Sequence, residues 1–377
     1  MARYDWWEHR NLRSETPNAI PRDFFSASYG VAVPAQTVGR PTSYTLFAGR
    51  LLSWLPRLTI VEDLYVLRTV SAVFGMLTLW VAWLGARECL GPLGGATVTA
   101  LLAVHPQFAV TATAAAPDAL ANLFAACVWW QSALAVRWNH SILPLVGVWG
   151  AAVAAASVDR MGVPLLALAL IVSLVVIAQQ IDSRTRLAAV VFVGLALVAA
   201  AWALGAAGET YSLRSVFTQD WLPVSAARSW SFWGKFTSFV HQSWWFSLGW
   251  VRYPPPSWWA AVVVTLTAVA AVGTGRHLLN FGALDSRRRT LIALAVFGVA
   301  LQVSAVYWTY FRLGHGGQGK SLFPVLVPCL VLLWSGIETW VPPPLRRHAA
   351  VALVLLLAFL DAAVWGLVAL PAYYASF

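Results

Sequence analysis

Charged residues are scarce in this sequence. They make up 11% of its 377 residues, whereas hydrophobic residues make up 59%; soluble domains average about 25% charged residues. Acidic residues are the scarcer sign, with 15 Asp and Glu against 25 Lys and Arg. This composition excludes an ordinary soluble domain and predicts a multi-pass membrane protein, whose surplus positive charge lies in cytoplasmic loops. No basic run is interleaved with aromatic residues, so nucleic acid is not an expected partner.

Cysteine is scarce as well. The three cysteines, Cys89, Cys127 and Cys329, have no CxxC spacing, so they predict no metal site, and we interpret them as small apolar side chains. The N-terminal stretch has no apolar core and is therefore not a signal peptide. Tryptophan, by contrast, is abundant at 22 residues, and its preference for the membrane–water interface fits a membrane protein.

Long apolar segments dominate the rest of the chain. A helix needs about 20 apolar residues to cross the hydrocarbon core, and about ten segments approach that length. They are residues 68–87, 93–112, 117–136, 142–158, 161–179, 187–207, 258–275, 290–309, 321–340 and 348–370. Only Asp159 and Arg160 separate 142–158 from 161–179, so this pair is either two crossings or a re-entrant hairpin. The predicted fold class is all-α, a polytopic bundle of about 9–10 transmembrane helices.

Arginine lies mainly in one alternate set of loops. These loops are short and carry little acid, so the positive-inside rule assigns them to the cytoplasm. They contain Arg87, Arg137, Arg184, Arg186, Arg276, Arg287, Arg288, Arg289, Arg346 and Arg347. The remaining loops are then extracytoplasmic, and they include the turn at Pro117 and Asp118. Proline suits the first turn of a helix, and Asp118 beside it faces the positive end of the helix dipole.

Two polar regions lie on the predicted extracytoplasmic side. Residues 1–67 form an N-terminal segment with interfacial helices, before a transmembrane domain at 68–377. Export of such a segment normally needs a preceding apolar helix, so we expect either a missing first span or an unusual topology. The loop 208–257 is rich in Trp, Phe and basic residues. Such a loop is either a plain interfacial helix or a lid over a lipid-linked anionic substrate.

Several segments resemble the GT-C superfamily of membrane glycosyltransferases in their order and spacing. They are RPTSYTLFAGRLLSWL (40–55), LYVLRTVSAVFGMLTLWVAWLGAREC (64–89), HPQFAVTATAAAPDALANLFAACVWW (105–130), SFWGKF and FSLGWVRYPPPSWW (within 231–259) and HGGQGKSLFPVLVPCLVLL (315–333). The resemblance includes protein O-mannosyltransferases and arabinosyltransferases, and it is closest to an uncharacterised bacterial branch.

This resemblance implies a function at the cell (plasma) membrane. It implies transfer of a hexose or pentose from a polyprenyl-phosphate-linked donor to a glycan or protein acceptor of the cell envelope, on the extracytoplasmic face. The lipid-linked sugar is the donor substrate, membrane lipids are further partners, and no cofactor is assigned. The sequence leaves open whether a divalent metal is required. The sequence leaves the sugar, the acceptor and the oligomeric state open.

The resemblance also implies site residues. The family carries its catalytic carboxylates as two adjacent acidic residues in the first outer loop. The nearest counterparts in this chain are Asp5 and Glu8, which are not adjacent. Basic groups that stabilise the departing phosphate are expected among the substrate-binding residues. The predicted substrate-binding residues are Asp118 and the basic residues Arg68, Arg228, Arg252, Arg312, His315 and Lys320. Asp118 is equally well explained as a helix-start residue, and Asp159 with Arg160 is interpreted as an internal ion pair.

Two other functions remain open at this point. Because the sequence departs from the family's acidic pair, the chain is alternatively a catalytically inactive scaffold subunit. A lipid or polysaccharide flippase or transporter is the third reading. Ion-coupled transporters carry charged residues at mid-membrane, whereas the charged residues here lie mostly at the ends of the spans.

Overall fold

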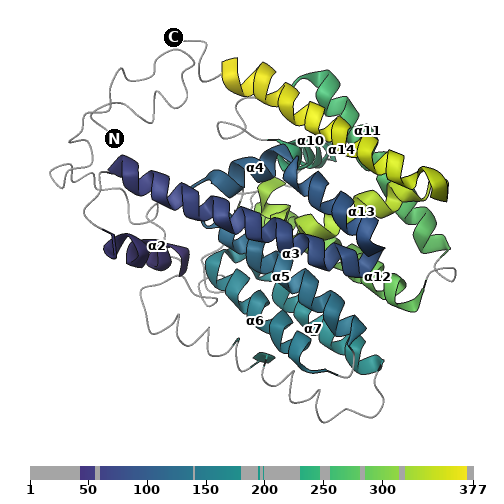
Figure 1. Ribbon diagram of the computed structural model, residues 1–377, viewed down its shortest axis with the longest axis horizontal. Helices are drawn as coiled ribbons and strands as arrows, with labels where there is room; N and C mark the ends of the chain where they lie inside the picture. The colour runs from purple at the N-terminus through teal and green to yellow at the C-terminus, as the bar shows by residue number, and fades with distance from the viewer. Residues whose placement is uncertain are drawn as a thin grey trace. The chain divides into compact units, whose positions relative to one another are not determined.

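The computed structural model describes residues 43–55, 60–138, 141–179, 194–195, 198, 230–246, 255–280, 285–313 and 319–371. Tertiary contacts divide the chain into two units, Met1–Pro41 and Thr42–Phe377, and all described residues belong to the second. These residues form helices and no strand (Figure 1). Seven of their helices are long and apolar enough to cross a membrane. This confirms the prediction of an all-α polytopic membrane bundle.

The longer helices follow the order of the predicted spans. They are α2 (Ser43–Ser53), α3 (Ile60–Ala103), α4 (Pro106–Thr113), α5 (Asp118–Arg137), α6 (Leu143–Val158), α7 (Pro164–Ala178), α10 (Trp230–Trp245), α11 (Ser257–Leu279), α12 (Ser286–Leu313), α13 (Leu326–Glu338) and α14 (Arg346–Val364). Short turns of other helix types are η2 (Arg160–Gly162), η4 (Gly319–Val325), η5 (Pro343–Leu345) and η6 (Trp365–Ala369). The predicted span 187–207 lies outside the described residues, apart from three isolated positions.

Helix α3 is two antiparallel helices joined at Gly91. This residue has a φ of 74°, a conformation that glycine adopts without the steric cost that a Cβ atom brings. Gly95 lies against the backbone of Arg87, and Gly75 lies against Ala112 of α4, which follows the returning arm of α3. The structure therefore contains the predicted spans 68–87 and 93–112 as neighbouring, oppositely directed segments.

The predicted span 93–112 is not continuous, which corrects the sequence prediction. Helix α3 ends at Ala103, and α4 begins at Pro106. Pro106 has no backbone N–H to donate to the preceding turn, so the helical hydrogen-bond ladder stops there. His105 is the N-cap of α4, where its Nδ1 accepts a hydrogen bond from the backbone N–H of Phe108 at 3.3 Å.

Burial distinguishes central helices from peripheral ones. In the most apolar stretch of α5, 67% of the residues are buried inside the protein, and in that of the η4–α13 segment 78% are buried. The corresponding shares in α11 and α14 are 28% and 22%. The first two therefore form the centre of the bundle, and the last two face the membrane. Trp129 and Trp334 are fully buried on the central helices, so these two tryptophans pack the core instead of lining the membrane interface.

Helices α11 and α13 cross at glycines. A Cβ atom at Gly336 would overlap the backbone carbonyl of Ala270, and one at Gly273 would overlap the carbonyl of Gly336. Thr274 Oγ1 donates a hydrogen bond to the carbonyl of Leu332 across the same crossing, at 3.1 Å. Small residues are how membrane helices bring their backbones this close, because dispersion contacts replace the hydrophobic driving force.

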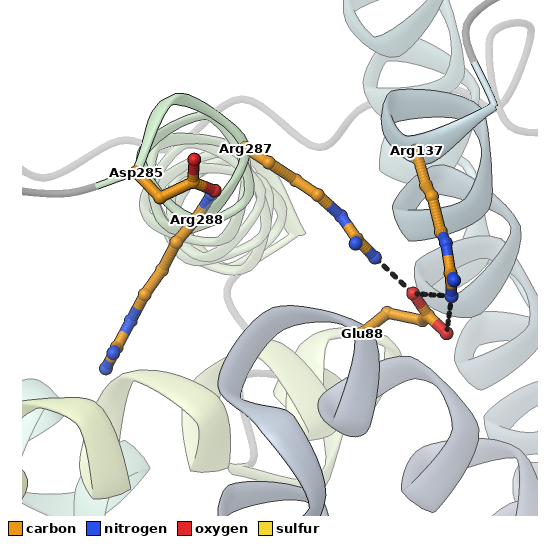
Figure 2. Close-up of polar contacts among 5 residues, drawn as sticks. All are labelled: Glu88, Arg137, Asp285, Arg287 and Arg288. Atoms are coloured by element: carbon orange, nitrogen blue, oxygen red, sulfur yellow. Dashed lines mark hydrogen bonds and ion pairs between the residues drawn. The ribbon is translucent and has the colours of Figure 1, made fainter.

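Two glutamates join the helices at one end of the bundle. Glu88 accepts hydrogen bonds from Arg137 of α5 at 2.9 Å and from Arg287 of α12, and Figure 2 shows these arginines approaching it from two helices. Glu338 pairs at 2.7 Å with Arg288 and also with Arg346. We call this the arginine end. It gathers four of the arginines that the sequence assigned to one side of the membrane.

Candidate functional site

The opposite end of the bundle contains Asp118, the first residue of α5, and we call it the Asp118 end. Lys320 of η4 approaches this carboxylate, with Nζ 3.5 Å from Oδ2. Arg68 of α3 donates from Nε to the carbonyl of Thr113 at 3.1 Å. Both cations therefore contact the segment Thr113–Asp118, which contains the predicted turn at Pro117. Three of the predicted substrate-binding residues are thus brought together.

Lys320 is held in place from two sides. The backbone N–H of Gly319 donates to Ser243 Oγ of α10 at 2.8 Å. A Cβ atom at Gly319 would overlap the backbone of Trp244, so only glycine allows this approach. Gln302 of α12, fully buried, donates from Nε2 to the carbonyl of Ser321 at 2.8 Å. These bonds fix the backbone on both sides of Lys320, while 44% of its side chain stays exposed.

Asp159 is a second carboxylate at this end. It is the N-cap of η2, and its Oδ1 accepts from the backbone N–H of Met161 at 2.7 Å. Burial raises the pKa of this carboxyl above its ordinary value and outweighs the hydrogen bond from Met161, which lowers the pKa; the charge of Asp118 raises it, and the charges of Arg160 and Lys320 lower it. The predicted ion pair between Asp159 and Arg160 is wrong, since no such pair occurs among the described residues. The carboxylate caps a backbone turn instead.

An aromatic box lies behind η4. His105 is fully buried, stacks on Trp245 with ring centroids 5.2 Å apart, and meets the rings of Trp244 and Phe323 edge-on at 4.8 and 5.8 Å. Its Nε2 has no hydrogen-bond partner among the described residues. Because Phe323 belongs to the same short helix as Lys320, the box packs against η4.

Part of the aromatic loop 208–257 is the helix α10. Its Phe236 and Val240 are buried against Val306 of α12, and Thr237 Oγ1 lies 2.5 Å from the hydroxyl of Tyr307. His241 Nε2 is 3.1 Å from Thr267 Oγ1 of α11. These contacts attach α10 to two transmembrane helices and to η4, so this part of the loop is a wall of the Asp118 end.

Helix α2 adds a further wall. Its Tyr44 and Ala48 are buried against Ala121 of α5 and Val158 of α6, and Ser43 Oγ donates to the carbonyl of Ser157 at 3.1 Å. Helix α2, which lies within the predicted N-terminal region 1–67, therefore packs on the ends of α5 and α6. These ends carry Asp118 and lead into Asp159.

Other predicted site residues lie outside the part of the chain that the structure describes. They are the catalytic candidates Asp5 and Glu8 and the basic candidates Arg228, Arg252 and His315. Arg312 is in the last turn of α12, and its side chain is likewise outside the described part.

The described side chains do not fit a protein-held metal ion. No group of three His, Cys, Asp or Glu side chains gathers at ligand spacing within the described ranges. Asp118 is instead engaged by an ammonium group. Among the described side chains, the Asp118 end offers cations beside carboxylates. Lys320 and the outer nitrogens of Arg68 can bind an anionic oxygen, because charge-assisted hydrogen bonds favour phosphate.

Sequence reasoning missed the residues that hold Lys320. Ser243 and Gln302 were not assigned a role, although a lone amide such as Gln302 within an apolar span is a signal of a buried polar partner. His105 was read only as part of a span. The proline that follows it was the available signal, because proline marks the first turn of a new helix.

A comparison with known protein families gives a match over part of the chain. Residues 51–203 match the family model described as dolichyl-phosphate-mannose-protein mannosyltransferase. No curated protein and no solved structure matches the chain. The matched segment includes Arg68, Asp118 and Asp159 and excludes Lys320. It confirms the predicted resemblance to GT-C membrane glycosyltransferases, and together with the seven apolar helices it supports a multi-pass membrane glycosyltransferase of this type.

Proposed function

We propose that this chain transfers a sugar from a polyprenyl-phosphate-linked donor to an acceptor of the cell envelope, at the extracytoplasmic face of the plasma membrane. The observation that carries the proposal is that Arg68 and Lys320 contact the two ends of the segment Thr113–Asp118, which lies within the part of the chain similar to mannosyltransferases. This end lies opposite the arginine end, and the positive-inside rule assigns the arginine end to the cytoplasm.

In this proposal the cations hold the donor phosphate. Lys320 presents its ammonium group on a side chain that is 44% exposed, whereas Arg68 is oriented through its Nε by the carbonyl of Thr113. The two outer nitrogens of Arg68 then face phosphate oxygens in the bidentate geometry that guanidinium favours. As the bond between the sugar and the phosphate breaks, negative charge grows on the phosphate, and both cations stabilise it.

Asp5 or Glu8 serves as the general base in this proposal. The acceptor hydroxyl attacks the anomeric carbon, a new glycosidic bond forms, and the bond from that carbon to the phosphate oxygen breaks. The carboxylate takes the hydroxyl proton, and polyprenyl phosphate leaves with the bonding electron pair. The assignment of these two acids comes from their place in the N-terminal segment and from the family resemblance.

Transfer from defined donors tests the function. Proteoliposomes containing the full chain are incubated with radiolabelled polyprenyl-phosphate hexose or pentose and with cell-envelope acceptor fractions, with and without a divalent-metal chelator. We expect transfer from one donor class, loss of transfer in Asp5→Asn or Glu8→Gln, and normal transfer in Arg276→Gln at the arginine end. A folded wild-type chain that transfers neither sugar class contradicts the proposal and favours a scaffold subunit.

A further inference from the structure

A membrane-facing groove lies at the arginine end, away from the Asp118 end. It has a volume of about 290 Å³ and runs between the returning arm of α3 and the peripheral helix α14. Its lining is Leu93, Ala96, Thr97, Ala100, Arg347, Ala350, Val351, Val354 and Leu355. The only polar group among the uncharged side chains is the hydroxyl of Thr97, which donates to the carbonyl of Leu93 at 2.8 Å. The wall of the groove is therefore apolar along its length and suits an apolar occupant.

One end of the groove carries positive charge. Arg347 lines it, and a neighbouring hollow of about 320 Å³ is lined by Arg347 and His348. Arg346 is paired with Glu338 at 2.7 Å, whereas Arg347 makes no ion pair within the described segments. An unneutralised guanidinium at the membrane surface attracts anionic headgroups.

The length of the groove indicates which lipid fits. From Arg347 to Leu355 the helix rises about 12 Å at 1.5 Å per residue. One leaflet of the hydrocarbon core is about 15 Å deep, half of the roughly 30 Å total. The groove is therefore about as deep as one leaflet. That depth matches an acyl chain of a phospholipid, whereas a polyprenyl chain that extends through the bilayer exceeds it.

We propose that this groove binds an acyl chain of an anionic phospholipid, with its phosphate held by Arg347. Leu93, Val351 and Leu355, which are 41%, 54% and 63% exposed, form the rims that the chain covers. The proposal is independent of sugar transfer, because the groove lies at the opposite end of the bundle from Lys320. The lipid comes from the leaflet that faces the arginine end.

Retention of lipid by the purified full chain tests the proposal. The protein is reconstituted in vesicles of equal parts phosphatidylglycerol and phosphatidylcholine, extracted in mild detergent, and its bound lipids are quantified by mass spectrometry. We expect the wild type to retain phosphatidylglycerol preferentially. We expect Arg347→Gln to lower this preference about fivefold, which is the contribution of one basic residue to the binding of an anionic surface. Arg347→Lys keeps the charge and should keep most of the preference.

A second pair of variants tests the groove itself. Ala96 is exposed within the groove, so Ala96→Phe fills it and lowers retention of both lipids. Ala271 on the exposed face of α11 is the matched control, and Ala271→Phe leaves retention unchanged. All variants are compared as monodisperse protein with wild-type tryptophan fluorescence. Unchanged preference in Arg347→Gln overturns the proposal. Displacement of phosphatidylglycerol by equimolar polyprenyl phosphate, or a dimer contact covering Ala96, also overturns it.

Discussion

Removing the charge of Glu88 tests whether the arginine end holds the bundle together. This side chain is 7% exposed and accepts from Arg137 and Arg287, whose side chains are 47% and 32% exposed. Hydrogen bonds between charged groups contribute about 1.5–3 kcal/mol each when buried, and solvent reduces exposed pairs to about 0–1 kcal/mol. Since the carboxylate is buried and the arginines are half-exposed, we expect Glu88→Gln to lower the free energy of unfolding by about 2 kcal/mol.

Tryptophan fluorescence during denaturant titration of the protein in mixed micelles measures this change, because several of the 22 tryptophans lie in the core. Asp63→Asn is the matched control. Asp63 lies in the first turn of the same helix and makes no ion pair among the residues described. The control should change the free energy of unfolding by less than about 0.5 kcal/mol.

A double-mutant cycle with Arg137→Gln separates the pair from its surroundings. We expect a coupling free energy of about 1 kcal/mol between Glu88 and Arg137, within the range for residues in one ionic network. The reasoning fails if Glu88→Gln unfolds at the same denaturant concentration as Asp63→Asn. It also fails if the two substitutions in the cycle are additive, because the arginine would then be stabilised by solvent alone.

Three further outcomes follow from the packing and the Asp118 end. Gly336→Ala should lower the free energy of unfolding by about 1–3 kcal/mol by overpacking, whereas Gly275→Ala, with nothing near its added methyl, should not destabilise the protein in the same titration. Because burial raises the Asp159 pKa in the folded chain, ionisation favours unfolding, so stability should fall as pH rises above the ordinary carboxyl range. Asp159→Asn keeps the cap and should abolish that dependence in unfolding titrations at several pH values. In transfer assays, Lys320→Gln should raise KM for the donor about tenfold. In the same assays, an Asp118→Asn variant with unchanged transfer would show that Asp118 is not part of the site.

Helix positions could be predicted from the sequence because apolar length and proline act locally. The turn at Pro117 and the reversal near Gly91 both follow from residues that change backbone geometry where they stand. The break at His105 was missed, since the flanking residues are apolar enough to read as one continuous span. Hydropathy reports the environment of a segment and not the continuity of its hydrogen bonds.

The candidate site was predicted less completely. Loop charge and family resemblance placed Arg68, Asp118 and Lys320 on one side of the membrane, and in the structure the two cations contact opposite ends of the segment Thr113–Asp118. The partners of Gln302 and the role of Ser243 could not be predicted, because they depend on which helices are neighbours. The same limit explains the error at Asp159, where adjacency in sequence favoured an ion pair and the backbone of Met161 offered a nearer donor.

The contact between Glu88 and Arg287 also constrains the biosynthesis of the chain. Glu88 and Arg137 are translated early, whereas Arg287 is translated on the order of ten seconds later at ordinary elongation rates. Until then, Arg137 is the only one of the two arginines that Glu88 can pair with. Arg137 alone already balances the charge of Glu88, so what α12 adds is a second hydrogen-bond donor to this carboxylate, and the contacts of Glu88 are complete only once α12 is in place.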